Sequence, residues 1–180
     1  MGNEINALLS GLAAGDMDAL GGLYDALSAR VFNYARTITR SRETAEDVTH
    51  DVFLQIHKQA ARLADMSDPA AYIMVTARHH AYNLLKRGKR ENVPPDNTPE
   101  AEEPSSPYDR LLFDDAFSRL PANQRETVYL HLVCGYLHKE VARLQNAPLV
   151  TVKWRYGKAL AQLRAYFTEN EKEEPYNECL

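Results

Sequence analysis

A proline-rich acidic stretch near the middle of the chain constrains the fold more than any other feature. Residues 91–107, ENVPPDNTPEAEEPSSP, hold five of the nine prolines in this 180-residue chain. Proline lacks the backbone N–H that regular structure needs, and so few apolar side chains cannot offset the entropy cost of ordering the segment. We therefore predict a flexible acidic linker here, with a separately folded part on each side of it.

Both folded parts have the apolar spacing of helices. Apolar residues recur three and four positions apart, and no stretch alternates convincingly with period two. The predicted fold class is therefore all-α, with two helical domains joined by the linker. We expect the domains at residues 1–90 and 108–167, the linker at 91–107 and an acidic tail at 168–180.

Short polar residues mark the helix starts of the first part. Asp16 and Ser41 are expected to cap two long helices, because their side chains can accept bonds from the free N–H groups of a first turn. Asp68 followed by Pro69 is typical of a third helix start. These signals predict a helix over about residues 16–40, a second from Ser41, a loop at 62–68, and a third over about 68–87 that stops before Gly88.

The second part has the layout of a helix-turn-helix. We predict helices at about residues 121–133, 137–145 and 149–167, with Asn146 left-handed at the turn and Pro148 blocking continuation of the preceding helix. The last helix has two unlike sides. Its expected core side carries Leu149, Val152, Tyr156, Ala159, Leu160, Leu163 and Phe167. Its expected outer side carries Thr151, Trp154 and Lys158, flanked by Lys153 and Arg155.

The charge layout favours a polyanionic partner. The whole chain carries −4, but residues 120–167 carry +5, and the acids gather in residues 92–119 and in the tail. A second basic run, RHHAYNLLKRGKR, lies at residues 78–90. Two basic patches fit DNA, with the last helix in a major groove. The simpler alternatives are solvated helix faces and a Trp154 that packs on a partner or on the other domain.

Catalytic and metal-binding chemistry find little support. The six histidines form no His-Glu-x-x-His pattern, and the two cysteines, Cys134 and Cys179, form no Cys-x-x-Cys. We expect no metal, no cofactor and no enzyme activity, and we interpret His80 as a packed histidine, because it shares a helix side with Ile73, Ala77 and Leu84. Two distant cysteines favour a reducing cytoplasm. We expect neither a signal peptide nor insertion in a membrane.

Two motifs resemble a known family. ETAEDVTHDVFLQIHK, residues 43–58, is similar to the core-polymerase-binding motif of the extracytoplasmic-function (ECF) sigma factors of bacterial RNA polymerase. RLPANQRETVYLHLVCGYLHKEVARLQNAPLVTVKWRYGKALAQLR, residues 119–164, is similar to the promoter-reading domain of that family. The resemblance covers residues 18–167. It implies a sigma region 2 bundle at 1–90 and a sigma region 4 helix-turn-helix at 108–167.

The resemblance implies a role for each matching residue. Core RNA polymerase would be bound through the acidic motif, and promoter DNA through the two basic patches, with an anti-sigma factor as a further partner. The implied polymerase-binding residues are Glu46, Asp47, Asp51 and Phe53. The implied contacts to the melted upstream element are Arg62, Tyr72, Arg78, His79, Lys86 and Arg87. Those to the farther, double-stranded element are Thr151, Lys153, Trp154, Arg155 and Lys158.

The departures from the family pattern fall in the DNA-reading parts. Asn146 and Val150 stand where the family has glycine, Trp154 where it has a small polar residue, and Asn83 where it has Asp. The polymerase-facing motif is intact. Two alternatives therefore stay open. One is a helix-turn-helix regulator that acts without polymerase, and the other is a sigma-like interaction protein without initiation activity.

Overall fold

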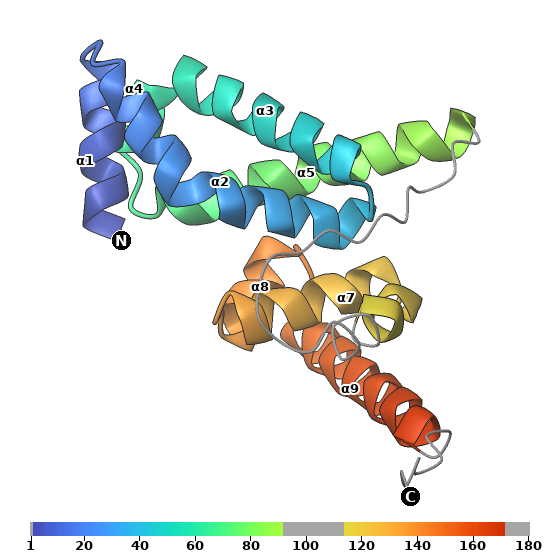
Figure 1. Ribbon diagram of the computed structural model, residues 1–180. Helices are drawn as coiled ribbons and strands as arrows, with labels where there is room; N and C mark the ends of the chain where they lie inside the picture. Colours follow the sequence, from blue (N-terminus) through green and yellow to red (C-terminus); the bar gives the residue numbers. More distant parts are fainter. Residues whose placement is uncertain (1, 92–113, 172–180) are drawn as a thin grey trace, which may run out of the picture. The chain divides into compact units, whose positions relative to one another are not determined.

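The computed structural model describes residues 2–91 and 114–171, which belong to two compact units divided between residues 98 and 99 (Figure 1). Within the described residues every regular element is helical. The predicted all-α fold with two helical domains is therefore confirmed. The predicted linker, apart from its first residue, and most of the predicted tail lie outside the described residues.

A helical hairpin of α2 (Asp18–Thr39) and α3 (Arg42–Lys58) forms the centre of the first unit. Arg40 turns the chain with a left-handed φ of 61°, and the Ser41 hydroxyl accepts the Thr44 N–H at 3.1 Å, as predicted for a cap. Asp16, the predicted cap, lies two residues before α2, and its carboxylate accepts the Asp18 N–H at 3.0 Å. From the helical spacing we expect one apolar face on each helix, with Leu20, Leu23, Leu27, Val31, Tyr34 and Ile38 on α2 and Ala45, Val48, Val52 and Ile56 on α3. All of these residues are buried except Leu20, which is half-buried.

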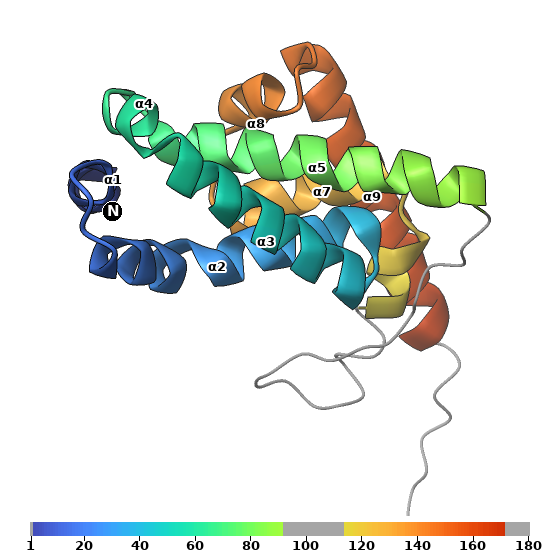
Figure 2. The ribbon, with the colours of Figure 1, turned by 90° about the horizontal axis from the view of Figure 1, so that it is seen from above.

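Helix α5 (Pro69–Glu91) packs against both α2 and α3 (Figure 2). Its predicted start is confirmed, since the Asp68 carboxylate accepts the Ala71 N–H at 3.0 Å. Its predicted end was wrong, because the helix continues through Gly88 to Glu91. A glycine weakens a helix by about 1 kcal/mol without blocking it, whereas the next proline, Pro94, would block it.

Two short helices complete the first unit, and the sequence patterns missed both. Helix α4 (Ala60–Ala64) occupies the start of the predicted loop at 62–68, and buried Leu63 anchors it. Helix α1 (Gly2–Ala13) packs against α4, α2 and α5. At Gly22 on α2 a Cβ would lie 2.9 Å from a methyl group of Leu8, so a larger residue there would require the Leu8 side chain to move.

The second unit surrounds a small apolar core. Residues 114–119 are helical, and α7 (Ala122–Val128) continues into a π-helical turn, η1 (Tyr129–Val133). The helix-turn-helix follows as α8 (His138–Leu144) and α9 (Leu149–Glu171). The core consists of Ala116, Leu120, Val128, Ala159 and Leu163, with Phe117, Tyr156, Tyr166 and Phe167 packed against it.

The turn of the helix-turn-helix has the predicted backbone. Asn146 has a left-handed φ of 48°, and Ala142 is buried where α8 meets α9. Two predictions for α9 were wrong. Leu149 is 41% exposed and does not join the core, because it lies in the first turn of α9, and the helix ends at Glu171 rather than at 167.

Candidate functional site

Three carboxylates line the solvent side of α3. Asp47 and Asp51 are one turn apart, so they lie on one stripe, and Glu46 lies beside Asp47. Glu46 accepts a bond from Arg42 at 3.0 Å in an exposed pair. The Asp51 carboxylate is 3.5 Å from the His80 Nδ1 of α5. Within the described part of the chain Asp47 makes no ion pair, so its charge faces solvent in full.

His80 is less enclosed than a core histidine. Its Nε2 donates to the Gln55 side chain of α3 at 3.2 Å, and a third of its side chain is exposed. His80 is therefore packed against α3, as predicted, but only in part. His80 connects α5 to the acidic stripe of α3 through polar contacts that the apolar pattern on α5 did not indicate.

Phe53 lies off the acidic stripe. Its side chain is 8% exposed and packs against the ring of Tyr24, with centroids 4.9 Å apart. The two rings line a groove of about 370 Å³ between α2 and α3, whose edge includes Glu46. Phe53 is thus positioned to act through the shape of this groove, and half-exposed Tyr24 is the more accessible ring.

The predicted residues of α4 and α5 lie on neighbouring stripes. Tyr72, His79 and Lys86 follow one another at seven-residue spacing and therefore share a face of α5. Cations pack on aromatic rings at two points. The Arg62 guanidinium lies 5.7 Å from the Tyr72 ring centroid, and Arg78 lies 4.7 Å from the Tyr82 ring centroid. His79, Lys86 and Arg87 are exposed. Sequence reasoning missed Tyr82, although it lies four positions from Arg78.

The outer side of α9 presents an aromatic ring and a cation together. Trp154 is 57% exposed, and the Lys158 Nζ lies 5.0 Å from its ring centroid. Lys153 is exposed and Thr151 is half-buried on the same first two turns, and Val150 is 79% exposed. The predicted outward placement of Trp154 and Lys158 is confirmed within this unit. A π-face beside an ammonium group suits a nucleic-acid groove, where bases and phosphates lie close together.

Arg155 differs from its neighbours on α9. It is half-buried, and its Nη1 donates to the Gln145 side chain at 2.9 Å. Gln145 follows α8 directly and is 4% exposed. Sequence reasoning placed Arg155 at the edge of the DNA-facing side and gave no role to Gln145.

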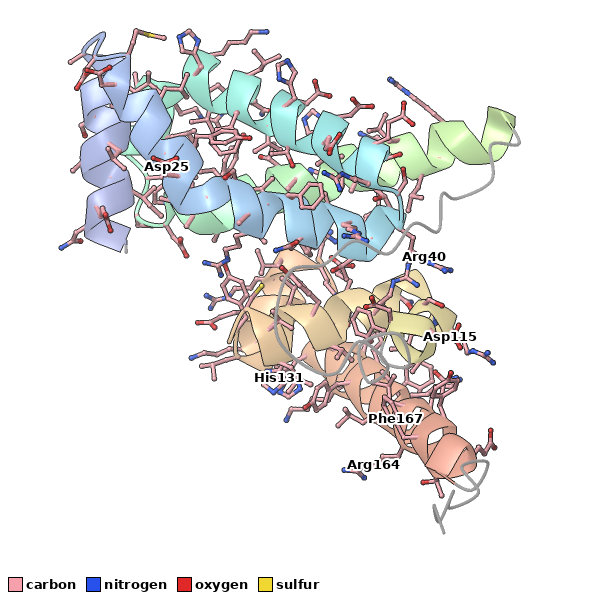
Figure 3. All side chains as sticks on the ribbon, in the orientation of Figure 1. Asp25, Arg40, Asp115, His131, Arg164 and Phe167 are labelled. Atoms are coloured by element: carbon pink, nitrogen blue, oxygen red, sulfur yellow. The ribbon has the colours of Figure 1, made fainter. Side chains whose placement is uncertain are left out.

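Two histidine rings pack against each other and against Tyr156 of α9. The rings of His131 (labelled in Figure 3) and His138 are 4.0 Å apart, and the Tyr156 ring meets each at 4.9 Å. The His131 Nδ1 donates to the Tyr136 carbonyl at 2.7 Å. Burial lowers the pKa of His138, and the nearby His131 and Lys153 lower this pKa further. Across residues 2–91 and 114–171 no three His, Cys, Asp or Glu side chains are grouped to hold a metal ion.

Comparison with known proteins decides the family. The profile of sigma-70 region 2 matches residues 23–91, and that of sigma-70 region 4 matches residues 110–163, so together they cover more than half of the chain. The chain belongs to the sigma-70 family. Its curated relatives are ECF sigma factors, so its role is promoter recognition and transcription initiation.

The individual relatives match along nearly the whole chain. The ECF sigma factor SigL of Mycobacterium tuberculosis is 28% identical over 91% of this chain and 97% of SigL. SigK of Mycobacterium bovis is 25% identical over 91% of this chain and 94% of SigK. Such relatives indicate a non-catalytic specificity subunit of RNA polymerase.

Two solved structures share the fold at 19% sequence identity. The sigma factor RpoE, in complex with the anti-sigma factor NepR from Bartonella quintana, gives a TM-score of 0.71 over 82% of this chain and 96% of RpoE. CnrH, in complex with the cytosolic domain of CnrY, gives 0.65 over 92% of this chain and 98% of CnrH. No helix within the described residues is long and apolar enough to cross a membrane.

Proposed function

We propose that residues 1–90 of this sigma factor bind core RNA polymerase and the melted upstream promoter element, while residues 108–167 bind the farther, double-stranded element. The observation that carries the proposal is that acidic side chains and cationic or aromatic side chains lie on different helices. Exposed carboxylates line α3, whereas cations and aromatic rings, exposed on α9 and partly exposed on α5, line the other two helices. Nucleic acid repels the first surface and attracts the second.

On α3, Glu46, Asp47 and Asp51 form the proposed polymerase contact. A basic surface on the largest polymerase subunit would complement them, and such complementarity sets partner choice and association rate. Asp47 supports the assignment best, because its charge is not used inside the fold. Phe53 contributes by holding the Tyr24 ring at the edge of the groove between α2 and α3.

On α5, the proposed ligand is single-stranded DNA. Aromatic rings with cations beside them can stack an unpaired base and neutralise its phosphate at once. Tyr72 with Arg62 provides one such pair, and His79 lies two turns farther along the same face. Lys86 and Arg87 extend the cationic surface, and Arg78 adds a charge over Tyr82. These residues would hold the melted strand after the duplex opens.

On α9, the proposed ligand is a major groove. Thr151 and Trp154 would meet base edges and methyl groups, while Lys153, Arg155 and Lys158 would meet phosphates. Trp154 in place of a small residue makes this surface bulkier than the family pattern, so the promoter sequence it selects should be its own.

An anti-sigma factor is the third proposed partner. The similar sigma factor RpoE was solved bound to one, which supports the same kind of regulation here. Such a protein would cover surfaces that the polymerase needs. The proposed site of action is the bacterial cytoplasm, where transcription takes place, and the proposed role involves no catalysis by this chain.

Site-specific crosslinking tests these assignments. A photoreactive residue replaces Asp47 in one variant and Trp154 in another, and each is assembled with core RNA polymerase on genomic promoter fragments. We expect crosslinks from position 47 to the largest polymerase subunit and from position 154 to duplex DNA upstream of the start site. Crosslinks from 154 to DNA without any from 47 to polymerase would favour a helix-turn-helix regulator. Polymerase crosslinks without DNA crosslinks would favour an interaction protein.

A further inference from the structure

A chain of buried polar side chains connects α7 to the DNA-facing helix. The Thr127 hydroxyl donates to the Asn123 carbonyl at 2.7 Å. The Gln145 Nε2 donates to that hydroxyl at 3.0 Å, and the Arg155 Nη1 donates to the Gln145 Oε1 at 2.9 Å. Thr127 and Gln145 are 0% and 4% exposed, so water has little access to the bond between them. The buried Gln145 side chain is therefore hydrogen-bonded directly to a cationic side chain of α9.

The donors and acceptors fix the direction of this chain. A threonine hydroxyl has one proton; the Asn123 carbonyl, at 2.7 Å, is a closer acceptor for it than the Gln145 Oε1, at 3.2 Å. Thr127 must then accept from the amide nitrogen of Gln145. Arginine can only donate, so the amide oxygen of Gln145 must face Arg155. Both constraints give the same amide orientation, and Gln145 is locked rather than free to flip.

A neutral acceptor suits a DNA-binding arginine. Within the described residues Gln145 is the hydrogen-bond partner of Arg155, and no carboxylate pairs with it. A carboxylate in this place would hold the guanidinium but cancel its charge. The Gln145 amide uses one of five N–H groups and leaves the full positive charge for a phosphate.

Holding this side chain still should increase affinity. A free arginine loses rotamer entropy when it binds, and an arginine that is already held loses less. We propose that Gln145 is a positioning residue that pre-orients Arg155 for promoter DNA, with Thr127 fixing Gln145 in turn. The inference rests on the proposed contact between Arg155 and DNA. Gln145 itself touches no base or phosphate in this proposal.

A double-mutant cycle tests the role in the intact holoenzyme. Gln145→Met keeps the length of the side chain and removes the amide, and it is combined with Arg155→Ala in the full chain bound to core RNA polymerase. Affinity is measured on a duplex that the holoenzyme transcribes from a genomic library. Gln145→Met should weaken binding about three- to tenfold when Arg155 is present, and little when it is Ala.

Gln124 provides a matched control. It is also 4% exposed in the same unit, and its side-chain oxygen has no hydrogen-bond partner within the described residues. Gln124→Met changes the same chemistry without touching Arg155, so its effect on affinity should not depend on Arg155. Thermal unfolding of both variants reports the purely structural cost.

The outcomes distinguish the positioning role of Gln145 from the proposed DNA contact of Arg155, on which that role rests. If Arg155→Ala leaves affinity unchanged, the proposed DNA contact of Arg155 is wrong and the positioning role is wrong with it. If Arg155→Ala weakens binding while Gln145→Met costs the same in both backgrounds, only the positioning role is overturned. An Arg155-dependent loss for Gln124→Met would also overturn it, because a general loosening of the unit would then explain the coupling.

Discussion

Reversing the charge of Asp47 should separate polymerase binding from folding. Asp47 is exposed and makes no ion pair within the described residues, so Asp47→Arg removes no ion pair there. Surface changes of this kind usually alter the free energy of unfolding by less than about 0.5 kcal/mol. The thermal midpoint of the variant should therefore match that of the native chain.

The expected loss of affinity follows from Coulomb's law. Two unit charges about 4 Å apart interact by about 1 kcal/mol in water and about 4 kcal/mol near a protein surface. Reversal replaces an attraction with a repulsion of similar size, so the change is about twice either figure. Even the lower value, about 2 kcal/mol, raises the dissociation constant for core RNA polymerase roughly 30-fold. Salt should reduce this difference in affinity between the native chain and the variant, because it screens the charges of Asp47 and its polymerase partner near the surface.

The assay is competition for core RNA polymerase against a fluorescent sigma factor at two salt concentrations. Glu4→Arg is the matched control, since Glu4 is an exposed acid on α1, outside the part that matches sigma-70 region 2. We expect the control to bind within about threefold of the native chain. Equal affinities for both variants would refute the assignment of the α3 stripe, as would a loss that salt leaves unchanged.

Three further outcomes follow from the second unit. Lys153→Ala should weaken binding to all DNA sequences and reduce the salt dependence by about one charge, measured by titration at several salt concentrations. Trp154→Ala should change which promoters are selected from a genomic library with little change in thermal midpoint, because the side chain is 57% exposed; a large loss of stability would contradict the outward assignment. Because the pKa of His138 is lowered from 6.5, the unfolded chain binds more protons, so the free energy of unfolding should fall as pH drops below 6.5. His138→Phe should flatten that slope in denaturant titrations followed by Trp154 fluorescence, and an unchanged slope would exclude His138 as its source.

The parts of the fold that were predictable depend on local chemistry. Ser41 caps α3 through a bond to a residue three positions on, and Asn146 turns the chain through its own backbone conformation. The buried stripes of α2 and α3 follow from helical spacing over four or more turns. Such features lie within one helix or one turn, so they can be predicted from the sequence without knowing how the helices pack.

The parts that were missed depend on short elements or on contacts between elements. Helix α4 is too short for a periodic pattern, and α1 buries its apolar side through contacts with α2, α4 and α5. The π-helical turn η1 changes the register after α7, so the stacking of His131 on His138 cannot be derived from regular helical spacing.

The candidate site divides in the same way. Exposed charges such as Asp47 and Lys158 were predictable, because a residue opposite an apolar stripe faces solvent. The partners of Arg155 and His80 were not predictable, because they lie on other helices and depend on how those helices cross. No sequence feature indicated the role of Gln145 except its position just before the turn. Its buried amide contacts α9 only because of how α8 and α9 cross.

Run-off transcription with purified components tests the central claim most directly. Core RNA polymerase is incubated with genomic promoter fragments alone, with the native chain, or with the Asp47→Arg variant. The account predicts discrete transcripts from a small set of fragments with the native chain, and few or none in the other two reactions. Transcripts that do not depend on the chain, or a chain that joins the polymerase without starting any transcript, would contradict it.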